Sequence, residues 1–226
     1  MESIVINNKM NNYAKFDVGN QPKIQVEKHT FAITYRLNGS LPVAFILDKK
    51  AEYDAKEDEA REKYGDSLEL EQRLLRLQQE NFIEFDAFLD KNPNEPHYLQ
   101  LPEVAEIVGD SLHHLAKSYY ELHAFCIMPN HVHVLLTLIA DAPNLAFILE
   151  RHKRYTGLQC NKIIGKIDNF WTAGCYEHAV RTEVSFLRYC LYTLNNPVKA
   201  GLVEDWRDWE HYYCNPDLLK HLVIGA

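Results

Sequence analysis

Residues 124–138, AFCIMPNHVHVLLTL, decide the fold that we expect for this chain. Two β-prone apolar runs, residues 122–128 and 132–139, are separated by Pro129 and Asn130. Proline and asparagine both favour turns, so the pattern predicts a β-hairpin.

A histidine pair lies on the second strand of this hairpin. Alternate residues of a strand share a face, so His131 and His133 project together while Val132 faces the opposite side. Neutral imidazole is the commonest metal ligand, and such a pair makes half of a divalent-metal site. The alternative is two ordinary histidines on a half-exposed strand.

The flanking patterns supply the other elements of the fold. A strand is expected at residues 29–37, and a strand or strand-like loop at residues 170–180. Helices are expected within residues 101–120, where Pro102 lies in the first turn, and at residues 144–166 and 183–196. The last helix should end before Pro197, because proline disfavours the helical conformation of the residue before it. The resulting order is strand, helix, strand, strand, helix, strand and one more helix.

This order predicts an α+β fold of the ferredoxin-like, split βαβ class, an antiparallel sheet with helices on one face. We expect a single domain over residues 1–226. Residues 1–28 have no clear period and are expected to form an arm or an irregular cover. Residues 41–47 either extend the first strand as a hairpin or begin a helical insertion.

Composition excludes several classes of protein. Of 226 residues, 46% are hydrophobic and 25% are charged, which is typical of a globular chain with a core. The apolar runs are far shorter than the roughly 20 residues of a membrane span, so we expect no membrane partner. The N-terminus shows no signal-peptide pattern, which favours a cytoplasmic location. Five scattered cysteines indicate reduced thiols.

The net charge of -8 argues against a uniformly basic nucleic-acid coat, but most of it is local. Residues 48–95 contain 15 acidic and 8 basic side chains, and the rest of the chain is near neutral. This segment is rich in helix-forming residues, so we expect an acidic helical insertion after the first strand. Gly65, Asp66 and Ser67 should separate two helices, with Asp66 or Ser67 as the second N-cap.

The insertion has apolar positions at helical spacing. They are Leu70, Leu74 and Leu77, followed by Phe82, Phe85 and Leu89. We interpret the segment as a solvated helical hairpin that keeps the protein soluble. A partner-binding arm is the alternative.

Residues 150–166, ERHKRYTGLQCNKIIGK, predict a basic helix. This stretch contains a single acidic residue and five basic ones, which are Arg151, Lys153, Arg154, Lys162 and Lys166. Together with an interleaved tyrosine, such a helix could follow a phosphate backbone. A merely solvated face is the alternative.

A tyrosine and an asparagine on the last helix complete the candidate site. Tyr192 and Asn196 are four residues apart and therefore neighbours on one face. Near the histidine pair they would place a nucleophile beside a three-ligand metal site. Tyrosine has an ordinary pKa of about 10 and needs a metal or a base to act as a nucleophile. Tyr189, one turn earlier, is the competing nucleophile.

Three motifs in this order, MPNHVH, FWTAGCYEHAV and the run from Tyr192 through NNPVKAGLV, resemble the single-tyrosine HUH transposases of small insertion sequences. The likeness is greatest to their REP-associated branch and covers residues 31–203, apart from the insertion. It implies a ferredoxin-like fold that binds single-stranded DNA hairpins or repeats. It also implies Mg²⁺ or Mn²⁺ and cleavage of one strand through a 5′-phosphotyrosine. Related proteins include monomers and dimers, so a homodimer stays open.

The resemblance also implies roles for individual residues. His131, His133 and Asn196 match the metal ligands, and Tyr192 matches the catalytic tyrosine. The family's basic helix would contact DNA through Arg151, Lys153, Arg154 and Lys162. In the strand motif Glu177, His178 and Arg181 would support the site, with ordinary strand structure as the alternative.

Two rival functions follow from the same residues. One is a regulatory DNA-hairpin-binding protein of the same fold with little or no cleavage. The other is an unrelated metal-dependent hydrolase. If the insertion is only a solvated arm, deletion of about residues 50–92 should leave cleavage intact and strengthen non-specific DNA binding.

Overall fold

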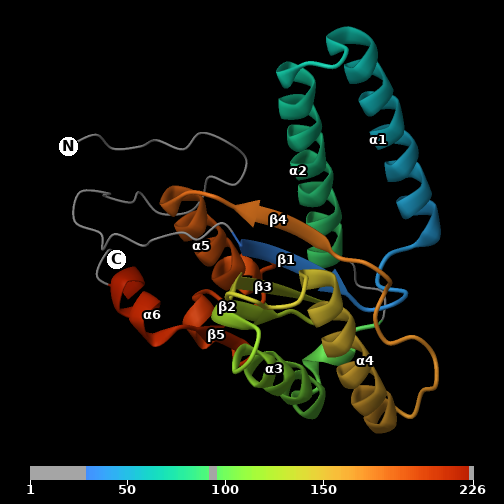
Figure 1. Ribbon diagram of the computed structural model, residues 1–226. Helices are drawn as coiled ribbons and strands as arrows, with labels where there is room; N and C mark the ends of the chain where they lie inside the picture. The colour runs from blue at the N-terminus through green and yellow to red at the C-terminus, as the bar shows by residue number, and fades with distance from the viewer. Residues whose placement is uncertain (1–28, 92–95, 224–226) are drawn as a thin grey trace.

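One antiparallel sheet organises the computed structural model, which describes residues 29–91 and 96–223. Its strands are β1 (Thr30–Arg36), β2 (Tyr120–Ile127), β3 (His131–Leu138), β4 (Tyr176–Val180) and β5 (Tyr212–Cys214). The order across the sheet is β4-β1-β3-β2-β5 (Figure 1). Because β3 pairs antiparallel with both β1 and β2, it splits a βαβ unit, which confirms the predicted α+β class. The arm expected at residues 1–28 lies outside the described residues.

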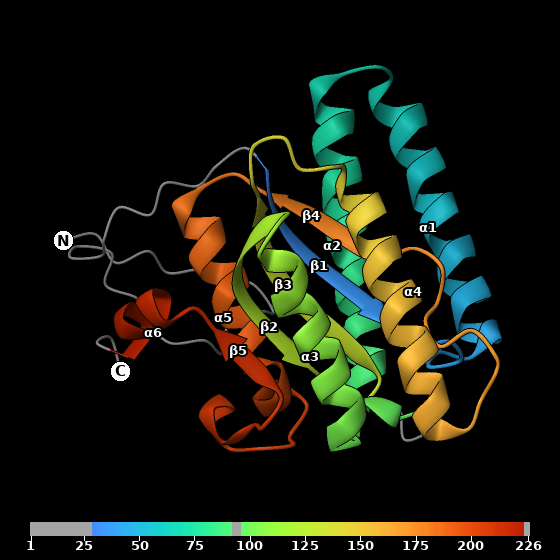
Figure 2. The ribbon, with the colours of Figure 1, turned by 60° about the horizontal axis from the view of Figure 1, so that its bottom comes forward.

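Helices cover both faces of the sheet. The two helices of the split βαβ plan, α3 (Pro102–Ala116) and α4 (Leu145–Ile164), lie side by side on one face, as predicted (Figure 2). The further helix α5 (Glu183–Lys199) packs on the opposite face, followed by β5 and α6 (Pro216–Val223). The expectation of helices on one face therefore holds for α3 and α4 and not for α5.

The alternation of strand residues divides the core into two layers. The layer under α3 and α4 receives Ile33, Tyr35, Val132 and Val134. The layer under α5 receives Ala32, Ala124 and Leu135, packed against Phe186, Cys190 and Leu194. Since His131 and His133 alternate with Val132 and Val134, both histidines lie on the α5 side.

A buried hydrogen-bond chain joins α4 to its face of the sheet. His152 Nε2 lies 2.7 Å from Tyr35 Oη, and His152 Nδ1 lies 2.9 Å from Ser111 Oγ on α3. Burial lowers the pKa of His152 to about 3, so this imidazole is neutral. The inner side of α4 therefore has a structural role, because it is bonded to β1 and α3.

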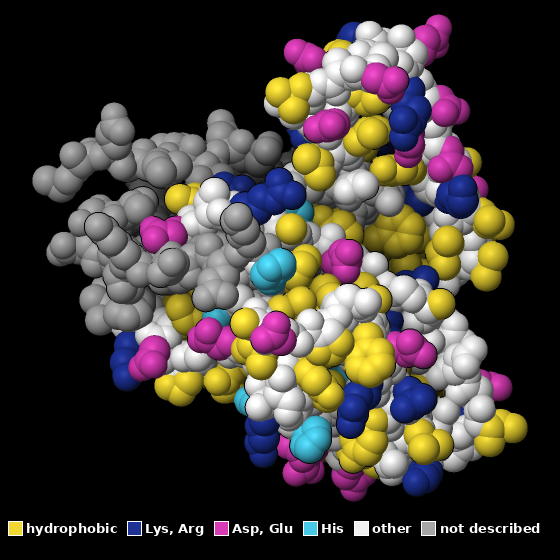
Figure 3. Space-filling model, in the orientation of Figure 1, with side chains coloured by type: hydrophobic (Ala, Val, Ile, Leu, Met, Phe, Trp, Pro, Cys, Tyr) yellow, Lys and Arg dark blue, Asp and Glu magenta, His cyan; other side chains and the backbone are white. Residues whose placement is uncertain are grey.

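The acidic insertion is a helical hairpin of α1 (Val43–Tyr64) and α2 (Leu68–Lys91) that projects from the sheet (Figure 1). Acidic side chains are spread over its surface (Figure 3). Gly65 has a φ of 53° and ends α1, and Ser67 Oγ accepts from Leu70 N as the N-cap of α2. Residues 41–47 therefore begin the insertion and do not extend β1.

Pro197 lies inside α5, and the prediction that the helix ends before it is wrong. Proline has a helical φ and removes only one backbone donor, here in the last turns. The chain closes with Ala200 N bonded to Asn196 O and Leu202 N bonded to Pro197 O. The extra turn brings Lys199 onto the same side of the helix as Tyr192.

One smaller expectation is refined. The strand expected over residues 170–180 is limited to β4, preceded by an isolated bridge between Leu37 and Trp171. Within the described ranges, no helix combines the length and the apolar character that crossing a membrane requires. All five cysteines are free thiols.

Candidate functional site

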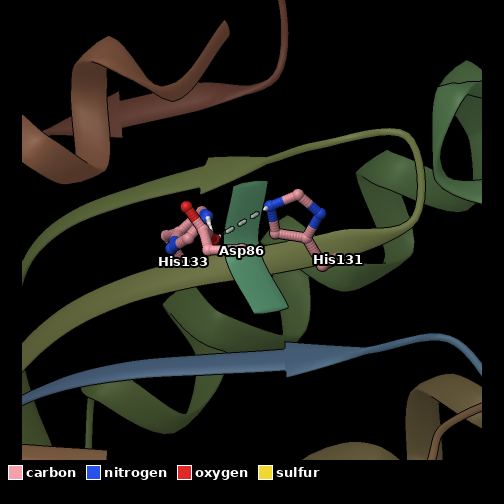
Figure 4. Close-up of side chains that lie close together, drawn as sticks. All are labelled: Asp86, His131 and His133. Carbon is pink, nitrogen blue, oxygen red and sulfur yellow. Dashed lines mark ion pairs between the residues drawn. The ribbon is translucent and has the colours of Figure 1, made fainter. Parts of the chain in front are cut away.

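The histidine pair forms the base of the candidate site. His131 and His133 are almost completely buried, and their ring centroids are 4.7 Å apart. The predicted sharing of a face is confirmed, and Asp86 from α2 lies between the two imidazoles (Figure 4). Residues from β3 and the inserted hairpin thus meet at one point.

Hydrogen bonds on the far side of each ring set its orientation. Asn130 Nδ2 donates to Leu89 O at 3.1 Å, which turns Asn130 Oδ1 toward His131. His131 Nδ1 therefore donates to Oδ1 at 2.6 Å, and the Nε2 of this imidazole carries the lone pair. His133 Nδ1 lies 2.9 Å from Thr34 Oγ1, which likewise directs Nε2 inward. Such contacts behind a histidine are typical of metal ligands.

Asp86 supplies the third group. Its Oδ1 lies 3.3 Å from His133 Nε2 and 3.7 Å from His131 Nε2. A second carboxylate oxygen, Asp90 Oδ1, lies 3.9 Å from His131 Nε2. Within the described part of the chain, all four of these buried atoms lack a hydrogen-bond partner.

These unsatisfied atoms fit a divalent cation. Buried polar groups are rarely left without partners, so three that converge, with Asp90 Oδ1 near one of them, need an explanation. Metal bonds of about 2.1 Å place neighbouring ligand atoms roughly 3–4 Å apart, as here. Two imidazole nitrogens and a carboxylate oxygen suit several divalent metals, so the donor set supports a metal without selecting one.

Tyr192 reaches the same carboxylate from α5. Its hydroxyl donates to Asp86 Oδ2, and its ring meets the ring of His133 edge-on at 5.7 Å. Lys199 Nζ contacts this Oδ2 as well and lies 2.8 Å from Asp90 Oδ2. Asp86 therefore connects the histidines through one oxygen and the tyrosine through the other.

Tyr189, the competing nucleophile, lies in a different group. Its ring centroid is 4.8 Å from that of His178 on β4, and its hydroxyl hydrogen-bonds to Tyr176. Burial raises the pKa of Tyr189 to about 12. The structure thus brings Tyr192, and not Tyr189, to Asp86 and the histidines.

The predicted supporting residues of β4 are divided between the two faces. His178 pairs with Ala32 and lies on the α5 side, whereas Glu177 pairs with Ile33 and faces the other way. Arg181 is exposed just after the strand. Tyr176 contributes on the α5 side, where its ring stacks on Phe82 of α2 at 3.8 Å.

Asn196 is fully buried beside the site. Its Nδ2 donates to Tyr192 O at 2.7 Å, and its Oδ1 lies 3.5 Å from Lys199 Nζ. The group that joins the histidines in this structure is therefore Asp86. The role of Asn196 as a metal ligand stays a prediction.

The electrostatics of the cluster follow from burial and from one cation. Burial would raise the pKa of Asp86, but the imidazole of His133, when protonated, and the ammonium group of Lys199 hold it well below its usual range. Burial lowers the pKa of Lys199, but Asp86 and Asp90 outweigh this effect and raise it. Burial, with Asp86 beside it, raises the pKa of Asp90. Burial lowers the pKa of His131, so its imidazole is neutral and Nε2 can offer its lone pair to a metal.

The predicted DNA-contacting residues lie on the far side of the sheet. Arg151, Arg154 and Lys162 are exposed on the outer side of α4. Arg151 Nη1 donates to Tyr119 Oη at 3.2 Å, and Lys162 Nζ donates to Gln159 Oε1 at 3.2 Å. The sheet separates α4 from the histidines, so this basic helix does not lie beside the candidate site.

Lys153 differs from its basic neighbours on α4. It is only partly exposed, and its Nζ donates to Thr172 O at 3.2 Å and to Gly174 O. Burial lowers its pKa. Lys153 therefore holds the loop before β4, which is a structural role.

Sequence reasoning missed Asp86, Asp90 and Lys199. Asp86 lies on the apolar side of α2, between Phe82 and Leu89, and an acid at such a position is a detectable signal. Asp90 follows one turn later on the same side. Lys199 was missed because it comes after the expected end of α5. The interpretation of the insertion as only a solvated arm is corrected by these contacts.

Comparisons with known proteins agree with the resemblance. No family model matches. A Haemophilus influenzae protein designated a REP-associated tyrosine transposase is 28% identical over 101 residues, 41% of this chain and 57% of that protein. The REP-associated tyrosine transposase of Escherichia coli K12 is 25% identical over 103 residues, 46% of this chain and 59% of that protein. The chain thus spans less than three fifths of the length of these curated relatives.

A solved structure of a REP-associated tyrosine transposase bound to a REP hairpin is also similar. It has a TM-score of 0.49 and 15% sequence identity, and it covers 86% of this chain and 82% of that one. Both curated relatives carry the designation that the three motifs predicted. The predicted resemblance is therefore confirmed.

Proposed function

We propose that this chain is a REP-associated tyrosine transposase that cuts and rejoins single-stranded, hairpin-containing DNA with a divalent metal. The observation that carries the proposal is the shared carboxylate. Asp86 accepts the hydroxyl of Tyr192 on one oxygen and faces the Nε2 atoms of His131 and His133 with the other.

The residues of the site suit attack on a phosphodiester. His131, His133 and Asp86 would hold Mg²⁺ or Mn²⁺, which as a Lewis acid would offset charge on the phosphate. Tyr192 Oη attacks phosphorus, the Oη–P bond forms and the P–O3′ bond breaks. The hydroxyl proton leaves along the hydrogen bond to Asp86, and O3′ takes a proton from water. The hydrogen bond fixes the direction of the nucleophile before the reaction.

The product is a 5′-phosphotyrosine and a free 3′-hydroxyl. The 5′-phosphotyrosine is itself a phosphodiester, so a second 3′-hydroxyl can attack its phosphorus, forming a new P–O3′ bond and releasing Tyr192. This sequence is strand transfer and not hydrolysis. It gives the chemistry of DNA recombination and transposition.

The proposal is tested by trapping the covalent adduct. The purified chain is incubated with Mn²⁺ and a single-stranded oligonucleotide that forms a hairpin and is labelled 3′ of the cleavage site, and labelled protein is measured on denaturing gels. We expect an adduct with the wild type and with Tyr189→Phe, and none with Tyr192→Phe, which lacks the attacking oxygen.

Other outcomes identify the rival functions. DNA binding without any adduct would favour a regulatory hairpin-binding protein. A free 5′-phosphate without attached protein would indicate a hydrolase. An adduct with Tyr192→Phe at the wild-type rate would show that another residue is the nucleophile.

A further inference from the structure

Lys199 lies against the two buried carboxylates of the site and against the nucleophile. Its Nζ contacts Asp86 Oδ2 and lies 2.8 Å from Asp90 Oδ2. It also lies 3.4 Å from Tyr192 Oη and 3.5 Å from Asn196 Oδ1. None of the motif roles that the resemblance implies includes this residue.

We infer that Lys199 is a further catalytic residue, whose ammonium group holds the oxygen of Tyr192 and offsets the negative charge that forms on it during attack. This inference rests on the proposed function. It concerns a contact with the reacting atom itself.

The N–H groups of Lys199 explain how one ammonium group can contact several oxygens. Ammonium has three N–H donors and no acceptor. The ammonium group donates to Asp86 Oδ2 and forms an ion pair with Asp90. Tyr192 Oη and Asn196 Oδ1 accept from it at 3.4 and 3.5 Å. The hydroxyl of Tyr192 has a single hydrogen, which points to Asp86, so a lone pair of Oη is available to Lys199.

The positive charge of Lys199 would stabilise the charge that forms on Tyr192 Oη during the reaction. When Oη passes its proton to Asp86, negative charge forms on Oη in a buried site. A cation at hydrogen-bond distance stabilises such a charge strongly where water is excluded. Lys199 Nζ contacts Asp86 Oδ2 and lies 3.4 Å from Tyr192 Oη, and its ion pair with Asp90 holds it there.

A structural role for Lys199 is the competing explanation, since its ion pairs join α2 to α5. The two roles differ in what a neutral replacement changes. A structural tie affects folding and DNA binding, whereas an electrostatic role in attack lowers the rate of the chemical step at saturating DNA. Restoring the charge with arginine should restore that rate in part.

The experiment compares Lys199→Met, Lys199→Arg and Lys220→Met, an exposed control on α6. Single-turnover adduct formation is measured at saturating hairpin DNA and Mn²⁺, with DNA affinity by fluorescence anisotropy. Loss of one preorganised donor typically costs about 10²–10³-fold in rate, which we expect for Lys199→Met at a nearly unchanged Kd. Lys199→Arg should recover at least part of the loss, and Lys220→Met should match the wild type.

A second variant protects the test against misfolding. Lys199→Met leaves two buried carboxylates without their cation, so Asp90→Asn/Lys199→Met restores the charge balance. If this double variant folds and reacts at the wild-type rate, or if Lys199→Met changes only Kd, the inference is overturned. Absence of an adduct with the wild-type protein would instead overturn the proposed function.

Discussion

Asp86 occupies a position on α2 where an acid is unfavourable without a partner. Its neighbours along the same side of the helix are Phe82 and Leu89, both buried. Removing a charge from water costs several kcal/mol unless opposite charge and hydrogen bonds compensate. Lys199 and Tyr192 compensate one carboxylate oxygen, and a cation would compensate the other.

Replacing Asp86 tests this assignment. Asp86→Asn keeps the shape of the side chain but removes the charge that faces His131 and His133. Even changes behind the ligands lower metal affinity by about 10–100-fold, so we expect a loss of at least 10-fold in Mn²⁺ affinity. Electron paramagnetic resonance of free Mn²⁺ measures it, with the exposed Asp66→Asn as the matched control. Equal affinity of Asp86→Asn and wild type would exclude Asp86 as a ligand.

The residues that sequence reasoning identified are those with local spacing. Strand alternation placed His131 and His133 together, and helical spacing placed Tyr192 beside Asn196. In the sequence, α3, β2 and their loops lie between Asp86 and the histidines, and no local period reports such a contact. The direction in which an inserted hairpin leans on a sheet depends on tertiary packing, here the stack of Phe82 on Tyr176.

At the scale of elements, the inserted hairpin has two parts with different contacts. Near the sheet, Phe45 of α1 stacks on Phe88 of α2 with ring centroids 4.0 Å apart, and Lys49 pairs with Glu84 at 2.8 Å. The outer part has a small core of its own, formed by Ala60, Leu70 and Leu77. Only the inner part carries the carboxylates of the site.

Two deletions separate these parts. Replacing residues 56–74 by a short glycine linker removes the outer turns, and we expect adduct formation to stay within a few-fold of wild type. Replacing residues 43–91 removes Asp86 and Asp90, and we expect adduct formation to be lost. Both proteins are compared in the gel assay, with circular dichroism as the control for folding.

The result would decide between two views of the insertion. Adduct formation by the larger deletion at the wild-type rate would mean that the hairpin is only a solvated arm. Loss of adduct in a folded shorter deletion would mean that the outer turns also take part.

At the scale of the whole molecule, the sheet separates chemistry from basic charge. The candidate site lies between β3, α2 and α5, while α4 lies on the opposite face of the sheet (Figure 2). Exposed cations line the outer side of α4. Tyr155 and Leu158 are 54% and 60% exposed among these cations, so the surface combines charge with apolar groups. We propose that this surface contacts DNA away from the cleaved phosphate.

Neutralising that surface should weaken DNA binding without slowing the reaction. For Arg154→Gln/Lys162→Gln we expect the salt dependence of Kd to fall by about 0.7 in slope for each phosphate that the protein no longer neutralises. Adduct formation at saturating DNA should be unchanged, because the sheet lies between α4 and the candidate site. Lys153→Met is the matched control and should lower the free energy of unfolding instead. An unchanged salt slope in the double variant would remove α4 from the DNA-binding surface.

The length of α2 relates a large displacement at the outer end of the hairpin to a small displacement of Asp86. Helices rise 1.5 Å per residue, so Leu68 at the outer end lies about 32 Å from Leu89, whose carbonyl is held by Asn130, and Asp86 lies about 4.5 Å from it. If α2 tilts about that anchor, a displacement of about 7 Å at the outer end moves Asp86 by about 1 Å. Tyr192 and both histidines are buried under this helix, so a small tilt both uncovers the nucleophile and loosens its hydrogen bond.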